Sequence, residues 1–247
     1  MDDDSHPSEV DVEKAESVLR SGIDLLSSIR ESRNEIREKS KREYGSGLLD
    51  AHLMVTGVLH EVLSRKSLIP GKTNKSIANR RVVIVSFVQG IPICEEAIRE
   101  GLYVQAAALV RQELETVAAI EEEVEDVRED GETPNVKHVP WEMNRLYGEL
   151  SAATHVSDHG YLAEIYRAEE RGDARPVSVV PTYRDGAARN LYAIHVGLLI
   201  QVAMHLHEVQ VEAYGEEEGG LEEFELLMIM RAVDILNEEG LLESDDS

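Results

Sequence analysis

The chain has 247 residues, enough for one sizeable core, and its 42% hydrophobic and 30% charged residues are a globular balance rather than a disordered one. The formal net charge of −24 repels phosphate backbones and anionic lipid surfaces, so neither bulk nucleic-acid binding nor membrane association is expected. Because only 4% of the residues are aromatic, the core must be built from Leu, Ile, Val and Ala, which is typical of helix bundles.

Other sequence features indicate the cellular compartment of the protein. The most apolar stretch, 191–204, contains His195 and Gln201 and is shorter than the roughly 20 apolar residues of a membrane helix. The first residues are acidic, whereas a secretory signal is basic and then apolar. The single cysteine, Cys94, cannot form an internal disulfide and excludes a cysteine-rich zinc site. We therefore expect a cytoplasmic protein.

Apolar residues three and four positions apart predict helices along most of the chain. Glycine, proline and polar runs mark the breaks between them, notably Gly45-Ser46-Gly47, the polar run 72–79 and the segments 131–140 and 172–186. The predicted helices cover about 10–42, 48–68, 80–101, 102–129, 141–157, 161–171, 187–214 and 221–239.

The predicted fold is all-α: a single antiparallel bundle of about seven helices. The β-branched run 82–85 would suit a strand, but it has no partner strand elsewhere, so we assign it to a helix kinked at Gly90-Ile91-Pro92. Residues 1–9 and 243–247 are expected to be disordered acidic tails around one helical domain, 10–242. Trp141 is expected to anchor the start of its helix by packing.

Two polar stripes interrupt otherwise apolar helices. Arg111 and Glu115 are four residues apart and share one helix face. Tyr147, Ser151, His155 and His159, again four apart, share another. Buried charges need partners, so we expect the two stripes to face one another in a buried cluster. Such a cluster either fixes helix register or binds a small ligand.

The segments AIREGLYVQAAALVRQELET and YGELSAATH, which carry these stripes, resemble a broad group of uncharacterised prokaryotic all-helical proteins. That group has an R-x-x-x-E helix ahead of a Y-x-x-x-S-x-x-x-H helix, and some members are placed near the HEPN superfamily. The resemblance covers residues 76–165 and points to Arg111, Glu115, Ser151 and His155. It implies a fold rather than an activity.

A second motif suggests an alternative function. Arg189, Asn190 and His195 fit R-N-x(4)-H, which resembles the R-x(4–6)-H motif of HEPN ribonucleases, in which Arg and His at a dimer interface attack RNA. The competing interpretation places His195 on the apolar helix face of Leu191 and Leu198. The two differ in geometry, because a ribonuclease needs both motif residues accessible in one cleft.

We considered a metal site and set it aside. His155, Asp158 and His159 have helical ligand spacing, but His205 and His207 diverge by about 200° on a helix and cannot both join them. No metal or other cofactor is expected.

We therefore expect a non-enzymatic helical protein whose polar cluster is structural or binds a small ligand. The alternative is a metal-independent ribonuclease of a toxin or phage-defence type, acting on RNA through Arg189 and His195. The last two predicted helices carry more apolar surface than one face needs, notably at 226–230, so a homodimer is expected.

Overall fold

The computed structural model describes residues 9–66, 71–140, 143–154, 158–168 and 177–240. Within these residues the regular secondary structure is helical, with one isolated bridge between Arg167 and Val177, which confirms the predicted all-α class. Seven of the nine α-helices in this part of the chain have nine or more residues. The helices are α1 (Glu9–Glu43), α2 (Gly45–Lys66), α3 (Lys75–Arg99), α4 (Tyr103–Val124), α5 (Leu146–Thr154), α6 (His159–Ile165), α7 (Asp185–Tyr214), α8 (Glu216–Gly219) and α9 (Glu223–Glu238), with two 3₁₀-helices at Val136–His138 and Met143–Arg145.

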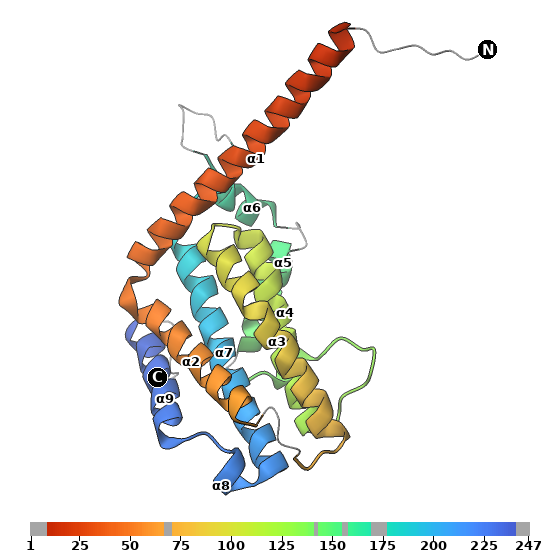
Figure 1. Ribbon diagram of the computed structural model, residues 1–247, viewed down its shortest axis with the longest axis vertical. Coiled ribbons are helices and arrows are strands. Elements are labelled where there is room, and N and C mark those ends of the chain that lie inside the picture. Colours follow the sequence, from red (N-terminus) through yellow and green to blue (C-terminus); the bar gives the residue numbers. More distant parts are fainter. Residues whose placement is uncertain (1–8, 67–70, 141–142, 155–157, 169–176, 241–247) are drawn as a thin grey trace, which may run out of the picture.

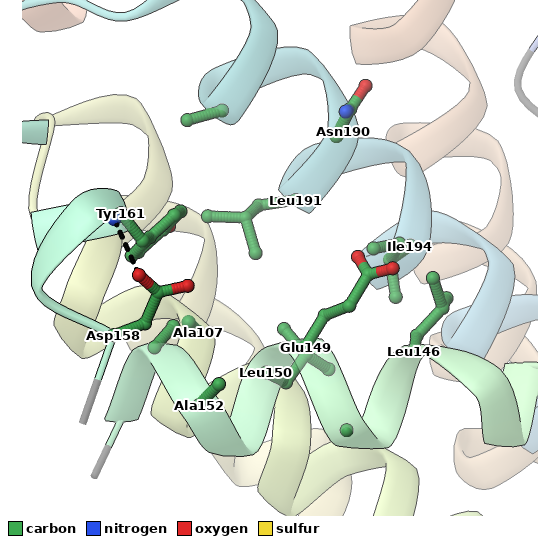
Figure 2. Close-up of a pocket in the computed structure, with 13 residues that line it drawn as sticks. Ala107, Leu146, Glu149, Leu150, Ala152, Asp158, Tyr161, Asn190, Leu191 and Ile194 are labelled. Atoms are coloured by element: carbon green, nitrogen blue, oxygen red, sulfur yellow. Dashed lines mark hydrogen bonds between the residues drawn. The ribbon is translucent and has the colours of Figure 1, made fainter. Parts of the chain in front are cut away.

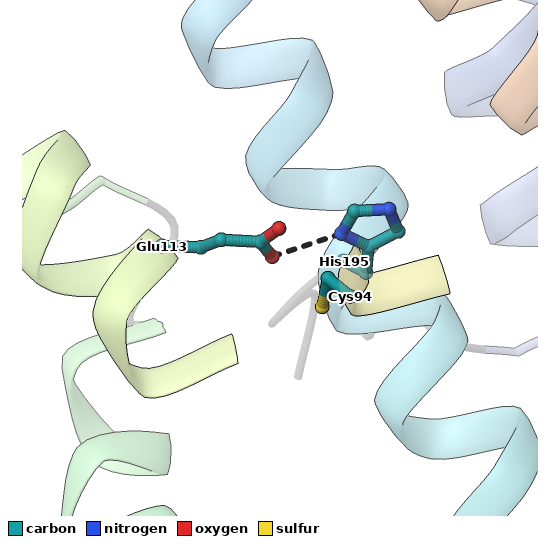
Figure 3. A group of neighbouring side chains, drawn as sticks. All are labelled: Cys94, Glu113 and His195. Carbon is teal, nitrogen blue, oxygen red and sulfur yellow. Dashed lines mark hydrogen bonds and ion pairs between the residues drawn. The ribbon is translucent and has the colours of Figure 1, made fainter. Parts of the chain in front are cut away.

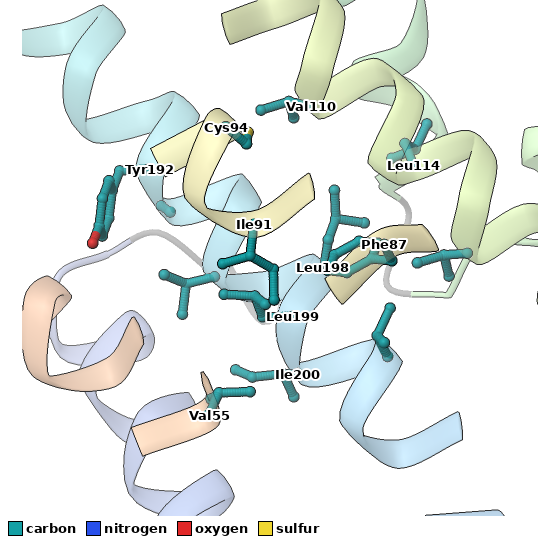
Figure 4. Packing of buried hydrophobic residues seen from close by; sticks show 14 of the residues in the cluster. Val55, Phe87, Ile91, Cys94, Val110, Leu114, Tyr192, Leu198, Leu199 and Ile200 are labelled. Carbon is teal, nitrogen blue, oxygen red and sulfur yellow. The ribbon is translucent and has the colours of Figure 1, made fainter. Parts of the chain in front are cut away.

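The centre of the bundle is α7, which packs against α2, α3, α4, α8 and α9. Figure 1 shows α2, α3, α4 and α7 side by side along the long axis of the molecule. Because 18 of the 30 residues of α7 are buried, this helix has no continuous polar face. Leu198 and Ile200 of α7 meet Phe87 of α3, Leu114 of α4 and Val55 of α2 in the core (Figure 4).

The first helix is anchored at one end and projects from the bundle at the other (Figure 1). Glu100, which is buried beside the turn between α3 and α4, pairs with Arg33 and Arg37 of α1. Ile36 packs over Gly101, where φ is +78° and an added Cβ would approach the Ile36 side chain to 2.8 Å. The last three turns of α1 are therefore fixed on the bundle by charge pairing and close backbone approach.

Several helix boundaries differ from the prediction. Gly45-Ser46-Gly47 does not separate two helices but forms the first turn of α2, and the bend lies at Tyr44. The run 72–79 is not all loop, because Asn74 caps α3 by accepting a hydrogen bond from the backbone N–H of Ile77. The β-branched run is helical as predicted, and α3 continues through Pro92.

The predicted helix 102–129 ends at Val124, close to Asp126, whose φ is +58°. The predicted helix 161–171 is replaced by the earlier and shorter α6. Trp141, His155 and the tails lie outside the described residues, except that Glu9 begins α1.

Apolar side chains remain exposed on the two terminal helices. In the predicted apolar run of α9, Ile229 is buried, whereas Leu226, Leu227 and Met230 are exposed. The projecting part of α1 exposes Val12, Val18, Leu19, Ile23, Leu25 and Leu26. Among the described residues, no helix combines the length and apolarity needed to cross a membrane.

Candidate functional site

The two predicted polar stripes meet where α5 packs on α4. Arg111 Nε donates to Glu115 Oε1 at 3.1 Å, and the Tyr147 hydroxyl donates to the same oxygen at 2.9 Å. Arg111 also donates to Thr154 Oγ1 at 3.3 Å and lies over the Tyr147 ring, 5.5 Å from its centroid. Arg111, Glu115, Tyr147 and Thr154 form what we call the α4–α5 network.

The α4–α5 network lies at the edge of the helix pair and not in the core, which corrects the expectation of a buried cluster. The Arg111 and Glu115 side chains are 25% and 21% exposed, because short α5 covers only one side of α4. Burial raises the pKa of Tyr147, and the hydrogen bond to the Glu115 carboxylate raises it further. The Ser151 hydroxyl is buried and has no hydrogen-bond partner among the described residues, but it lies near enough to Tyr147 to offset part of the rise in that pKa.

A pocket of about 490 Å³ lies on the other side of α5, between α4, α5, α6 and α7. Figure 2 shows the Glu149 carboxylate extending from α5 toward α7, and Asp158 accepting a hydrogen bond from the backbone N–H of Tyr161. The described residues that line this pocket are mostly apolar and include two carboxylates but no Lys, Arg or His. They are Ala107, Leu146, Gly148, Glu149, Leu150, Ala152, Ala153, Asp158, Tyr161, Ala187, Asn190, Leu191 and Ile194.

The helical period of α5 explains why it can hold both features. Tyr147 and Thr154 face the α4–α5 network, while Leu146, Glu149 and Ala153 line the pocket. The network thus fastens the helix that forms one wall of the pocket. Sequence reasoning identified the network face of α5 but missed the pocket face.

The predicted ribonuclease pair does not share a solvent-accessible cleft. The side chain of His195 is fully buried, and its Nδ1 lies 2.8 Å from Glu113 Oε2. Arg189 lies near the surface, where it pairs with Glu239 at 3.2 Å and with Asp185 at 3.7 Å. Six residues along a helix turn the direction of the side chain by about 240°, which separates the two groups. Within one chain this geometry does not support the catalytic assignment of Arg189 and His195.

His195 instead belongs to a buried polar group that sequence reasoning did not predict. Its ring stacks on that of His52 in α2, with the centroids 5.3 Å apart, and Cys94 lies beside it in α3. Burial and, to a lesser degree, the neighbouring His195 lower the pKa of His52 to about 4. These residues come from different helices, so no local spacing in the sequence connects them.

Among the described residues, the histidines that we weighed as metal ligands lie in three different surroundings. His159 is exposed at the start of α6, and Asp158 caps that helix. His205 is buried on α7 beside Glu121, 3.2 Å from its carboxylate, whereas His207 accepts a hydrogen bond from the backbone N–H of Leu221. These side chains therefore do not form one group of metal ligands.

Comparison with protein-family models, curated proteins and solved structures found no match. The resemblance to the R-x-x-x-E and Y-x-x-x-S-x-x-x-H group therefore stays a hypothesis, and the function must be argued from the geometry.

Proposed function

We propose that this protein is a non-enzymatic helical binding protein whose pocket between α4, α5, α6 and α7 holds a small ligand. The observation that carries the proposal is the size and lining of the pocket. Small-molecule sites in proteins occupy about 300–1,000 Å³ and combine an apolar lining with a few polar groups. A pocket of about 490 Å³ with Glu149, Asp158, Tyr161 and Asn190 among apolar side chains fits that description.

The charges favour a ligand with an apolar body and a cationic end, such as a primary amine. Glu149 is exposed, extends into the pocket and has no cation beside it in the described lining. The net charge of −24 also attracts cations to the protein as a whole. An anionic ligand would meet two carboxylates and no counterion in that lining, which disfavours it.

In this proposal the α4–α5 network is structural and supports the pocket. The contacts of Arg111 with Thr154 and of Glu115 with Tyr147 join the two helices across their interface. A binding wall built from a nine-residue helix needs such contacts, since isolated helices of that length are marginal in water. The network would therefore affect ligand affinity by holding α5 in place.

Matched probes test the charge preference. 2-Phenylethylamine and 3-phenylpropanoate share an apolar body and differ in the sign of the end group, so calorimetric titration should detect binding of the amine and not of the carboxylate. Glu149→Gln should weaken amine binding by about 1 kcal/mol, or roughly fivefold, because a partly exposed ion pair contributes that much. Glu216→Gln on α8 is the control and should leave the affinity unchanged. Equal binding of both probes would refute the proposed ligand class.

We also propose that the protein is a homodimer, joined through α1 and not through the 226–230 run of α9 on which the expected dimer was based. The exposed residues Val12, Leu19 and Leu26 recur every seven positions, as on a helix that pairs with another helix. Between Glu9 and Asp24 the helix has five acidic and two basic residues, whereas 30–42 has six basic and three acidic ones, although Arg33 and Arg37 are already paired with Glu100. An antiparallel pair of α1 helices would bring these opposite charges together.

Light scattering tests the dimer. The wild-type protein should have twice the 27.6 kDa mass of the chain at micromolar concentration, and Leu19→Glu should halve the measured mass. Val82→Glu, at an exposed position of α3, should leave the dimer intact. A wild-type protein that stays a monomer at these concentrations would contradict the proposal.

A further inference from the structure

Three chemically reactive side chains meet in the core where α3, α4 and α7 pack together. Figure 3 shows the Glu113 carboxylate of α4 extending to His195 of α7, with Cys94 of α3 beside the pair. All three are buried, and the Cys94 sulfur, a Glu113 carboxylate oxygen and a His195 ring nitrogen lie within 4.8 Å of one another. The Cys94–Glu113–His195 site lies outside the ligand pocket described above and plays no part in the proposed function.

The protein does not complete the polar contacts of this site. Glu113 Oε2 lies 2.8 Å from His195 Nδ1, but the buried Glu113 Oε1 has no hydrogen-bond partner among the described residues, and neither has His195 Nε2. Leaving a buried polar atom without a partner costs about 1–3 kcal/mol. The unpartnered carboxylate oxygen belongs to a side chain that is only 8% exposed and extends toward His195.

We propose that Cys94, Glu113 and His195 bind a divalent transition-metal ion, with zinc the best match. Thiolate, imidazole and carboxylate are the ligands that zinc takes in proteins, at about 2.3, 2.0–2.1 and 2.0–2.2 Å respectively. Magnesium and calcium are bound almost entirely through oxygen, so the sulfur and nitrogen atoms disfavour them. A tetrahedral ion bound by these three groups keeps one further coordination position.

The charges balance when the metal binds. The Cys94 thiol loses its proton to solvent, and the Nδ1 proton of His195 moves to Nε2, so that Nδ1 can coordinate. Thiolate and carboxylate together supply two negative charges, which neutralise the divalent ion inside the core. Without the metal, burial raises the pKa of the Cys94 thiol, and Glu113 raises it further. Metal binding should therefore release one proton per ion and join α3, α4 and α7.

Cobalt is the sharpest probe, because cobalt bound to a thiolate has an intense charge-transfer absorption in the near ultraviolet. Because the site is buried, the full-length chain is first unfolded in denaturant that contains a chelator. The chelator is then removed, and the chain is refolded with Co²⁺. Cys94 is the only cysteine in the sequence, so any thiolate–cobalt band must come from this site. We expect the band to saturate at one cobalt per chain and to disappear when zinc displaces the cobalt.

Variants and metal content complete the test. Protein expressed with added zinc and purified without chelators should contain about one zinc per chain, and Cys94→Ser should lower this content by more than about tenfold. His205→Gln removes a different buried histidine of α7, paired with Glu121, and should retain the zinc and the cobalt band. Circular dichroism verifies that each variant is folded.

The outcomes are distinct. A folded wild-type chain that binds no cobalt, or binds it without a thiolate band, would overturn the proposal and leave the cluster as a buried hydrogen-bonded group. A folded Cys94→Ser variant that keeps its zinc would also overturn it. If Cys94→Ser does not fold, the cobalt spectrum of the wild-type protein decides alone.

Discussion

Substitutions that remove contacts between α4 and α5 should lower the free energy of unfolding by different amounts. Tyr147→Phe removes one hydrogen bond to Glu115 and keeps the ring beside Arg111, so it should lower the free energy of unfolding by about 1 kcal/mol. Arg111→Ala removes the ion pair and the contact with Thr154. Because the two charged side chains are 25% and 21% exposed, water can hydrate Glu115 afterwards. The expected loss is about 1–2 kcal/mol, below the roughly 3–5 kcal/mol of a fully buried pair.

A double-mutant cycle isolates the contact that joins the helices. Glu115→Ala and Tyr147→Phe, alone and combined, are compared by urea unfolding with linear extrapolation. The coupling energy should be about 0.5–1.5 kcal/mol, the net contribution of a hydrogen bond that is partly exposed. A coupling below about 0.3 kcal/mol, within the usual error of additivity, would show that the two residues do not interact. A loss above about 3 kcal/mol for Arg111→Ala would show a buried cluster instead of an edge network.

Other variants test the anchoring of α1 and the reassignment of the motif residues. Glu100→Gln should lower the free energy of unfolding by about 1–3 kcal/mol and speed hydrogen exchange in 29–42, because the buried carboxylate loses its charge pairing with α1; unchanged exchange there would contradict this anchoring. Gly101→Ala should destabilise by about 1–3 kcal/mol because of its positive φ and the close approach of α1, whereas Gly90→Ala, with open space around it, should stabilise by about 0.5–1 kcal/mol. An equal effect of the two glycine variants on the urea midpoint would refute the packing argument. Arg189→Ala should change stability by less than about 0.5 kcal/mol and leave RNA integrity in expressing cells as it is with the wild type; RNA degradation that depends on Arg189 and His195 would revive the ribonuclease reading.

Sequence periodicity was sufficient to predict the long helices and the contacts between residues of one helix. The apolar run of α7 predicted 187–214, and the structure begins that helix two residues earlier, at Asp185. The spacing of Arg111 and Glu115 predicted their pairing, because residues four apart meet on any helix. The spacing did not predict how deeply Arg111 and Glu115 are buried, because their burial depends on how much of α4 the short α5 covers.

Boundaries and contacts between helices were harder to predict. The polar run before α3 resembles a loop in composition, and only the capping by Asn74 shows where the helix begins. His195 and Glu113 are 82 positions apart, so only the packing of α7 on α4 brings them together. The ligand pocket likewise combines residues of four helices, and its shape is a property of the fold and not of any motif.

The central claim is that the pocket between α4, α5, α6 and α7 binds a small ligand with an apolar body and a cationic end. The most direct test follows the backbone amide signals of the ¹⁵N-labelled protein by NMR during titration with 2-phenylethylamine. The account predicts saturable shifts concentrated at Leu146–Ala153 and Ala187–Ile194, which should be lost in Ala187→Trp, a variant that fills the pocket. Shifts spread over the acidic surface, or shifts that persist unchanged in Ala187→Trp, would contradict it.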